Sequence, residues 1–234
     1  MIELLHEDLA WCLRRLPAGV LSMLKERPLF LAGGFIRDCI AGEPPSDIDI
    51  FGPTKDALEA AARKLGEDAR VIETDNAFTV IGKGRLSVQF IHRWTYKTAA
   101  EIVPSFDFSI ARAAAWYDDK GWHSICDDRF YPDLAAKRLV YCCPDRNEDA
   151  GGSMLRVLKF YQRGYRIPLD SLGAVMARLI RAVDVKELLS HGAETHESQW
   201  AKVLTGLLHE VDPNVDPTHI SHLPSLKEQE TPTP

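Results

Sequence analysis

Apolar and polar positions follow two different periods along this chain, and the change of period divides it. Up to about residue 130, short apolar or alternating runs typical of β-strands are interleaved with segments whose apolar residues recur every three or four positions, as in helices. From Asp133 to about Leu208 only the helical period remains. Strands mixed with helices, followed by helices alone, predict an α+β domain with a helical annex.

The same pattern predicts individual elements. Helices are expected over 3–26 with a break at Pro17, from the glycine pair Gly33-Gly34 to about Gly42, over 55–65 and near 98–102. Strands are expected over 28–32, from Asp47 onward, and in two hairpins, one over 78–81 and 85–92 and one over 113–117 and 122–125. The helix over 55–65 has both ends marked, because Thr54 is a favourable N-cap and Gly66 a favourable terminator.

Composition places the chain among ordinary globular proteins. Of its 234 residues, 45% are hydrophobic and 26% are charged, so it can bury a sizeable core. It has no apolar run of the roughly eighteen residues that cross a membrane, and the acidic Glu3, Glu7 and Asp8 do not suit a signal peptide. Five cysteines, an odd number, favour reduced thiols over a disulfide framework. We therefore expect a cytoplasmic protein with no membrane partner.

Charge is spread unevenly along the chain. The net charge is −6, yet the segment 129–186 contains eleven Lys and Arg against six Asp and Glu, a local excess of +5. The rest of the chain then carries −11. This distribution fits a polyanion that docks on the basic segment only, and ordinary scatter of surface charge is the alternative.

The segment Asp47-Ile48-Asp49 carries the clearest chemistry. Because side chains alternate along a strand, Asp47 and Asp49 share one face while Ile48 points into the core. Two neighbouring carboxylates can share a hard divalent cation. Just before them, Gly33 and Gly34 open a helix, where backbone N–H groups can face a phosphate. The pattern predicts a site for a metal–nucleoside triphosphate, and the alternative is a plain strand end beside a plain turn.

Several motifs in order resemble one family. They are Gly33-Gly34-Phe35-Ile36-Arg37-Asp38, Gly42, Pro45-Ser46-Asp47-Ile48-Asp49, Asp107-Phe108-Ser109-Ile110, Asp128-Arg129-Phe130-Tyr131-Pro132-Asp133-Leu134, Glu148-Asp149, Leu155-Arg156-Val157-Leu158-Lys159-Phe160 and Arg163-Gly164-Tyr165. Together they resemble the head and neck of class II CCA-adding enzymes and bacterial poly(A) polymerases, which belong to the polymerase-β-like nucleotidyltransferase superfamily. The resemblance covers about residues 28–170.

The resemblance implies a fold and an activity. The fold would be a polymerase-β-like head with a mixed β-sheet over 1–130, including the N-terminal helix, then an all-helical neck-like region over 131–210. Separately, the composition of residues 224–234, with little to bury, predicts a disordered tail, placed over 211–234. The activity would be transfer of a nucleoside monophosphate from ATP or CTP to an acceptor hydroxyl, with Mg²⁺ or Mn²⁺ and release of pyrophosphate. The implied acceptor is the 3′ end of tRNA or another RNA.

The resemblance also implies roles for individual residues. Asp47 and Asp49 would hold the metal and act in catalysis. Gly33, Gly34, Arg37 and Asp38 would lie at the triphosphate, where Arg37 neutralises charge or braces Asp38. The residues implied near the base are Asp149, Arg156 and Lys159.

One position departs from the family in the catalytic set. The family has a third carboxylate on a later strand, and Gln89 stands at that place in this sequence. An amide can offer a metal only a neutral oxygen and cannot take a proton from a hydroxyl. Three explanations remain open. Asp107 supplies the missing carboxylate, or two aspartates suffice with the substrate phosphates, or the protein binds nucleotide without catalysis.

Other departures concern the base and the acceptor. Ala111 stands where the family has Asn, and Ala150-Gly151-Gly152-Ser153 replaces the region of the first neck arginine. The chain is also shorter than the full enzymes, so either the acceptor is small or a dimer mate or partner protein supplies the grip on RNA. Two other functions stay open, a nucleotide-binding regulator without transferase activity and a nucleotidyltransferase that modifies a protein or a small molecule.

Overall fold

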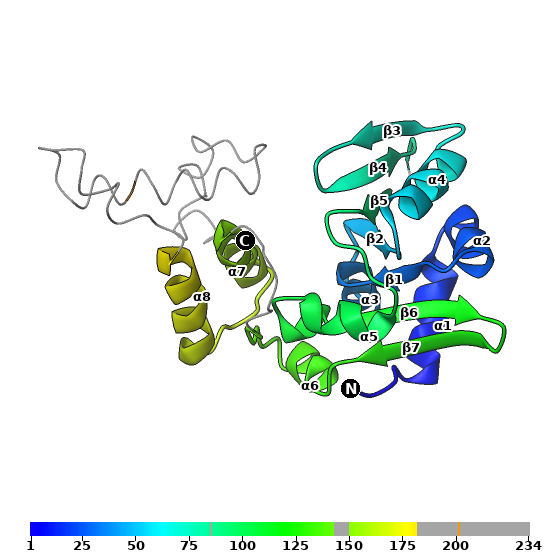
Figure 1. Cartoon of the computed structure of the whole chain (residues 1–234). Helices are drawn as coiled ribbons and strands as arrows, with labels where there is room; N and C mark the ends of the chain where they lie inside the picture. Colours follow the sequence, from blue (N-terminus) through cyan, green and yellow to red (C-terminus); the bar gives the residue numbers. More distant parts are fainter. Residues whose placement is uncertain (85, 143–149, 182–200, 202–234) are drawn as a thin grey trace, which may run out of the picture. The chain divides into compact units, whose positions relative to one another are not determined.

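The computed structural model describes residues 1–84, 86–142, 150–181 and 201 (Figure 1). The chain divides into two compact units, Met1–Asp145 with Tyr165–Ser171, and Arg146–Gly164 with Leu172–Pro234. The first unit thus extends beyond residue 130. Asp149 and the tail predicted over 211–234 lie outside the described residues.

The first unit contains a sheet and the helices around it. The helical elements are α1 (His6–Arg15), α2 (Ala18–Glu26), α3 (Gly34–Ile40), α4 (Lys55–Leu65), α5 (Ala99–Ile102), η1 (Val103–Ser105), η2 (Ser109–Ala111) and α6 (Phe130–Ala135). The strands are β1 (Phe30–Ala32), β2 (Asp47–Phe51), β3 (Arg70–Glu73), β4 (Ala77–Ile81), β5 (Ser87–Ile91), β6 (Ala113–Asp118) and β7 (Gly121–Cys126). Both predicted hairpins and the predicted break near Pro17 are present.

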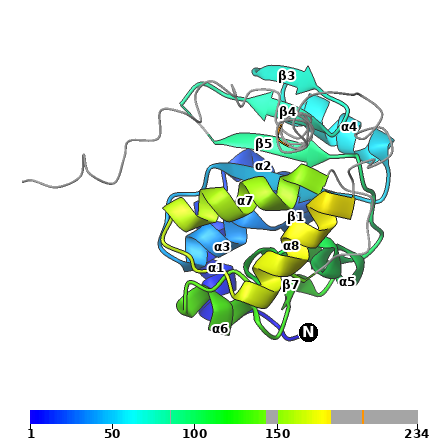
Figure 2. The ribbon, with the colours of Figure 1, turned by 90° about the vertical axis from the view of Figure 1, so that its left-hand side faces the viewer.

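The seven strands form one mixed sheet in the order β3-β4-β5-β2-β1-β6-β7. The β2–β5 pair is parallel, and the other neighbours are antiparallel. In Figure 2, β3, β4 and β5 follow one another at one end of the sheet with α4 beside them. The α+β fold with a mixed sheet is therefore confirmed.

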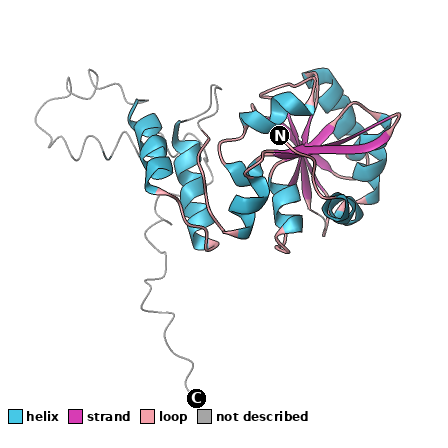
Figure 3. Ribbon diagram, turned by 90° about the horizontal axis from the view of Figure 1, so that it is seen from below, coloured by secondary structure: helices cyan, strands magenta, loops and turns pink. Residues whose placement is uncertain are grey.

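Helices cover both faces of the twisted sheet (Figure 3). On one face Phe30 and Phe51 pack with Ile102 of α5 and Val103 of η1. On the other face, alternation places the buried Ile48 and Ile50, and α2 and α4 pack together there. Since residues of β2 alternate, Asp47 and Asp49 lie on the same face as Phe51.

The helix α4 follows directly from its sequence. The Thr54 side chain accepts a hydrogen bond from the backbone N–H of Ala57, and the N–H of Gly66 closes the last turn on the carbonyl of Ala62. Both predicted ends are confirmed. The strand β3 was not predicted, because its four residues, Arg-Val-Ile-Glu, form a short edge strand with exposed ends.

Two helices follow in the chain, α7 (Ala150–Gln162) and α8 (Leu169–Arg181), as the helical period predicts. The division between the two units crosses α8 at Ser171. Throughout the described ranges, every helix is too short or too polar to cross a bilayer.

Candidate functional site

The two aspartates of β2 lie near the start of the strand, on its polar face. Asp47 and Asp49 are half-buried, whereas Ile48 and Ile50 between and after them are fully buried. The strand period of two therefore separates the carboxylates from the core, as predicted. Both carboxylates are accessible from the same side of the sheet and can contact one ligand.

Gln89 lies beside this pair. The parallel register of β2 and β5 places Gln89 opposite Asp49. The Gln89 side chain reaches diagonally, and its Nε2 donates a hydrogen bond to Oδ2 of Asp47 over 3.3 Å. Sequence comparison placed an amide where a third acid was expected, and the structure adds that this amide contacts one of the two aspartates.

Gly33 is required by its surroundings. Its φ of +81° is a conformation that side chains disfavour, and a Cβ there would lie 3.1 Å from the Phe106 ring and 3.7 Å from Oδ2 of Asp49. Its N–H donates to the carbonyl of Ala113 over 3.0 Å. The prediction that this N–H faces a phosphate does not fit that bond. What Gly33 provides is a close approach of the backbone to the Phe106 ring and the Asp49 carboxylate, which a side chain would prevent.

Arg37 and Asp38 form a buried ion pair at the next turn. Nε and one terminal nitrogen of Arg37 donate to the two carboxylate oxygens of Asp38 over 2.8 and 3.0 Å. The guanidinium also lies 3.2 Å from the place where a Cβ of Gly34 would be. Of the two roles considered for Arg37, this geometry fits the brace for Asp38.

The helix α3 that carries this pair is anchored by α1. The indole Nε1 of Trp11 donates to the carbonyl of Cys39 over 3.1 Å, and the Cys12 thiol contacts the carbonyl of Ile36 at 3.9 Å. A hydrogen bond to Cys39 and burial raise the pKa of the Cys12 thiol, so Cys12 stays protonated. These contacts fix the helix that begins next to Gly33.

Asp107 is buried in the loop before η2. Its backbone carbonyl accepts a hydrogen bond from the N–H of Cys142 over 2.7 Å, and Arg112 holds the preceding carbonyls of Pro104 and Phe106. Across the described ranges, His, Cys, Asp and Glu side chains form no group of three that could hold a metal ion. The structure therefore does not bring Asp107 together with Asp47 and Asp49 into such a group.

The residues assigned to the base belong to the second unit. Arg156 is half-buried and Lys159 is exposed on α7, three positions apart on the helix. Asp149, their expected companion, lies outside the described residues. Their role toward a base stays a prediction.

Asp133 is a structural residue whose role the sequence did not suggest. It is fully buried, and its carboxylate accepts hydrogen bonds from the Ser109 hydroxyl at 2.7 Å, Arg138 at 2.7 Å and Arg129 at 3.2 Å. It ties α6 to η2, which begins two residues after Asp107. The signal was available, because Asp133 belongs to the Asp128–Leu134 motif, but the sequence does not show that its partner is Ser109.

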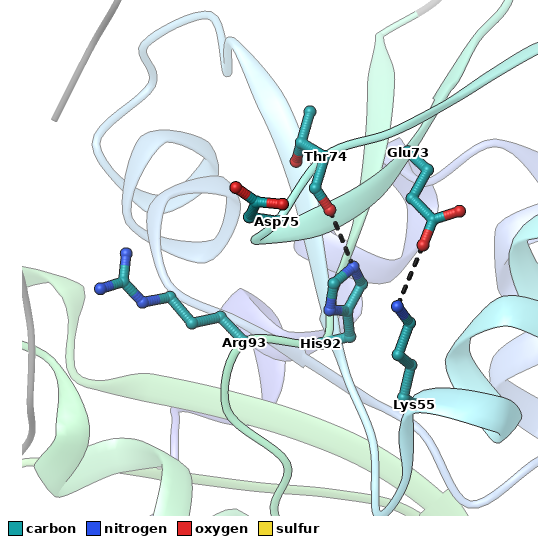
Figure 4. A pocket seen from close by; sticks show the side chains of 6 residues that line it. All are labelled: Lys55, Glu73, Thr74, Asp75, His92 and Arg93. Atoms are coloured by element: carbon teal, nitrogen blue, oxygen red, sulfur yellow. Dashed lines mark hydrogen bonds and ion pairs between the residues drawn. The ribbon is translucent and has the colours of Figure 1, made fainter. Parts of the chain in front are cut away.

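A surface pocket of about 530 Å³ lies elsewhere on the first unit (Figure 4). Its lining residues are Lys55, Glu73, Thr74, Asp75, His92 and Arg93. Glu73 is the last residue of β3, and the others lie just beyond the ends of β2, β3 and β5. The pocket is therefore at the opposite end of these strands from Asp47. In Figure 4 the Lys55 ammonium points to Glu73 at 3.0 Å, and this hydrogen bond lowers the pKa of the Glu73 carboxyl. The pocket is separate from the aspartate pair.

Several solved structures have a fold similar to that of this chain. A CCA-adding enzyme in complex with ATP shares 19% sequence identity with this chain at a TM-score of 0.57. The match covers 87% of this chain and 52% of that enzyme's chain. A Thermotoga maritima CCA-adding enzyme complexed with tRNA shares 18% sequence identity at a TM-score of 0.55, and the match covers 87% of this chain and 54% of that enzyme's chain. A CCA-adding enzyme in complex with CTP shares 20% sequence identity at a TM-score of 0.54, and the match covers 88% of this chain and 51% of that enzyme's chain. The chain therefore has a nucleotidyltransferase-like fold and spans about half the length of these structures.

The family is defined by sequence. The profile of the Gabija anti-defense 2 family matches residues 3–137, more than half of the chain. The protein belongs to this family. A search of curated proteins found no match to this chain.

Proposed function

We propose that this protein is a metal-dependent nucleotidyltransferase. It transfers a nucleoside monophosphate from ATP or CTP to an acceptor hydroxyl and releases pyrophosphate. The observation that carries the proposal is the placement of Asp47 and Asp49 on one face of β2, beside the bare Cα of Gly33, within a nucleotidyltransferase-like fold.

The donor set suits a hard cation. Carboxylate oxygens from two aspartates, completed by water and phosphate oxygens, are the ligands that Mg²⁺ and Mn²⁺ take in nucleotide sites. Asp47 and Asp49 are the residues that would hold the ion. When bound there, it would polarise the phosphoryl oxygens and offset their negative charge.

The protein's own residues would position the triphosphate. Without a side chain, Gly33 lets the backbone before α3 lie close to both the Phe106 ring and the Asp49 carboxylate that would hold the cation. The Arg37–Asp38 pair would keep the first turn of α3 fixed beside Gly33 and Asp49, so that these residues are preorganised for the nucleotide. In the proposed neck, over 131–210, Asp149, Arg156 and Lys159 would contact the base.

RNA is the acceptor that the neighbours favour. One similar structure is described as complexed with tRNA, and others with ATP and CTP. We propose the 3′ end of tRNA or another RNA as acceptor. Since the chain spans about half the length of those enzymes, a second copy or a partner protein would complete the grip on RNA. The family name indicates action against Gabija defence, and we propose nucleotidyl transfer as the chemistry of that action.

Labelled nucleotides test this proposal. The chain is incubated with Mg²⁺, total RNA and each NTP labelled at its α-phosphate, in parallel with Asp47→Ala and with Asp56→Ala, which removes an exposed carboxylate on α4. Label should enter RNA with the wild type and Asp56→Ala, and fall to background with Asp47→Ala. Label that enters protein or a small molecule would overturn RNA as the acceptor and keep the transferase.

A second function is favoured by one contact. The hydrogen bond from Gln89 to Asp47 occupies a carboxylate oxygen that a fully catalytic set would leave for metal or acceptor. It favours a regulator that binds nucleotide without transferring it. Binding of ATP or CTP by calorimetry, with no labelled product from any acceptor, would establish that alternative.

A further inference from the structure

The amide of Gln89 has a defined orientation. The amide contacts the carboxylate of Asp47 on the neighbouring strand, and an ionised carboxylate accepts hydrogen bonds but cannot donate them. The amino end of the amide therefore faces Oδ2 of Asp47 at 3.3 Å, because the reverse orientation would place two oxygens against each other. The carbonyl oxygen of Gln89, its one atom able to bind a cation, is turned away from Asp47.

Charge at the site leads to the same conclusion. The triphosphate supplies anionic oxygens to a cation bound with it, whereas the protein itself contributes only two carboxylates. Two cations about 4 Å apart, the arrangement of two-metal sites, repel each other and need further anionic ligands. Gln89 adds no charge, and Asp107 does not join the aspartates in a group of three. A second cation would also meet the N–H hydrogens of Gln89 beside Asp47.

We propose that Asp47 and Asp49 bind a single divalent cation together with the nucleotide, and that Gln89 is a positioning residue that holds Asp47 instead of a ligand for a second cation. The inference rests on the proposed function, since it concerns the same site. It replaces the two-metal arrangement that the resemblance implies with a one-metal site.

Counting bound ions tests this inference without measuring turnover. Mn²⁺ is titrated into the full chain in the presence of a saturating non-hydrolysable ATP or CTP analogue, and free Mn²⁺ is followed by electron paramagnetic resonance. The wild type should bind one Mn²⁺ per chain and Asp49→Asn should lose it. Gln89→Glu should bind two, because it restores a third carboxylate.

Two further variants separate the effect of an added negative charge from the effect of its position beside Asp47. Gln162→Glu adds the same charge at an exposed position on α7 and should still bind one ion. Gln89→Met removes the amide without adding charge and should keep one ion, bound about tenfold more weakly, as expected for the loss of one hydrogen bond to a carboxylate. Thermal unfolding of each variant confirms that it is folded.

The outcomes are distinct. Two ions bound by the wild type would overturn the one-metal site and leave the proposed function intact. One ion bound by Gln89→Glu, or two by Gln162→Glu as well, would overturn the role given to Gln89. Absence of any nucleotide-dependent ion in the wild type would overturn the proposed function itself.

Discussion

The Oδ2 atom of Asp49 lies 3.7 Å from the point at which a side chain on Gly33 would begin. The same point is 3.1 Å from the Phe106 ring. One glycine thus lies against both a carboxylate and an aromatic ring, and a side chain there would meet the ring. The relationship joins β2 to the segment before α3, which are separated in the sequence by α3 itself and a loop.

Substitution of this glycine should impair both folding and binding. Gly33→Ala forces a Cβ into a positive φ and against the Phe106 ring, so we expect a loss of about 1–3 kcal/mol of unfolding free energy and a weaker affinity for ATP or CTP. Urea denaturation and calorimetry measure the two effects. Gly42→Ala is the matched control, since Gly42 has a φ of +72° but open space around it. Equal effects of both variants on nucleotide affinity would contradict the role of Gly33.

The buried ion pair at α3 should be sensitive to the loss of one partner. Arg37→Leu leaves the Asp38 carboxylate buried without its bidentate donor, and we expect a cost of about 3–5 kcal/mol. Arg63→Leu removes an exposed partner of Glu59 on α4 and should cost less than about 1 kcal/mol. Chemical denaturation compares the two. A cost for Arg37→Leu as small as that of the control would show that the pair does not hold α3.

Asp133 should be as important for stability as the core around it. Asp133→Ala leaves the donors of Ser109, Arg129 and Arg138 without their shared acceptor, and we expect a loss of about 2–4 kcal/mol. Asp128→Ala, in the same motif, removes an exposed ion pair with the N-terminus and should cost much less, because solvent screens that pair. Thermal unfolding followed by circular dichroism tests the difference, and similar melting temperatures for both variants would refute it.

Alkaline pH should weaken the attachment of the N-terminal segment. The Tyr131 hydroxyl donates to Asp8 at 2.8 Å and accepts from the N–H of Leu5 at 3.0 Å. Burial, with the hydrogen bond to Asp8, raises the pKa of Tyr131 above its usual value. The protonated phenol is thus favoured in the folded state, and this stability is present below the ordinary tyrosine pKa of about 10 and is lost as pH rises above it.

The variant Tyr131→Phe isolates that effect. Its unfolding free energy should fall less than that of the wild type when urea denaturation at pH 8 is compared with pH 11. Tyr161→Phe, at an exposed position on α7, should follow the wild type. Identical slopes for all three proteins would show that Tyr131 does not contribute to the alkaline loss.

Local sequence was enough for much of this fold. The helix α4 is determined by an N-cap, apolar residues at helical spacing and a terminating glycine, all within thirteen residues of sequence. The alternation in β2 was likewise enough to place Asp47 and Asp49 on one face. Both follow from periods and caps that act over short distances.

Contacts between distant segments could not be predicted in this way. The hydrogen bond from Gln89 to Asp47 depends on the parallel register of β2 and β5, which lie some forty residues apart. The bond from Gly33 to Ala113 and the buried partners of Asp133 depend equally on tertiary packing. The sequence therefore indicated which residues carry the chemistry, and the structure was needed to show what each one touches.

Pyrophosphate release tests the central claim most directly. The wild type, Asp49→Asn and the exposed-carboxylate control Asp56→Asn are each incubated with Mg²⁺, ATP and CTP, and total RNA, and the pyrophosphate formed is measured over time. We predict RNA-dependent release by the wild type and the control, reduced about 100-fold or more in Asp49→Asn. Equal release by all three proteins, or none by the wild type, would contradict the assignment of a nucleotidyltransferase site to Asp47 and Asp49.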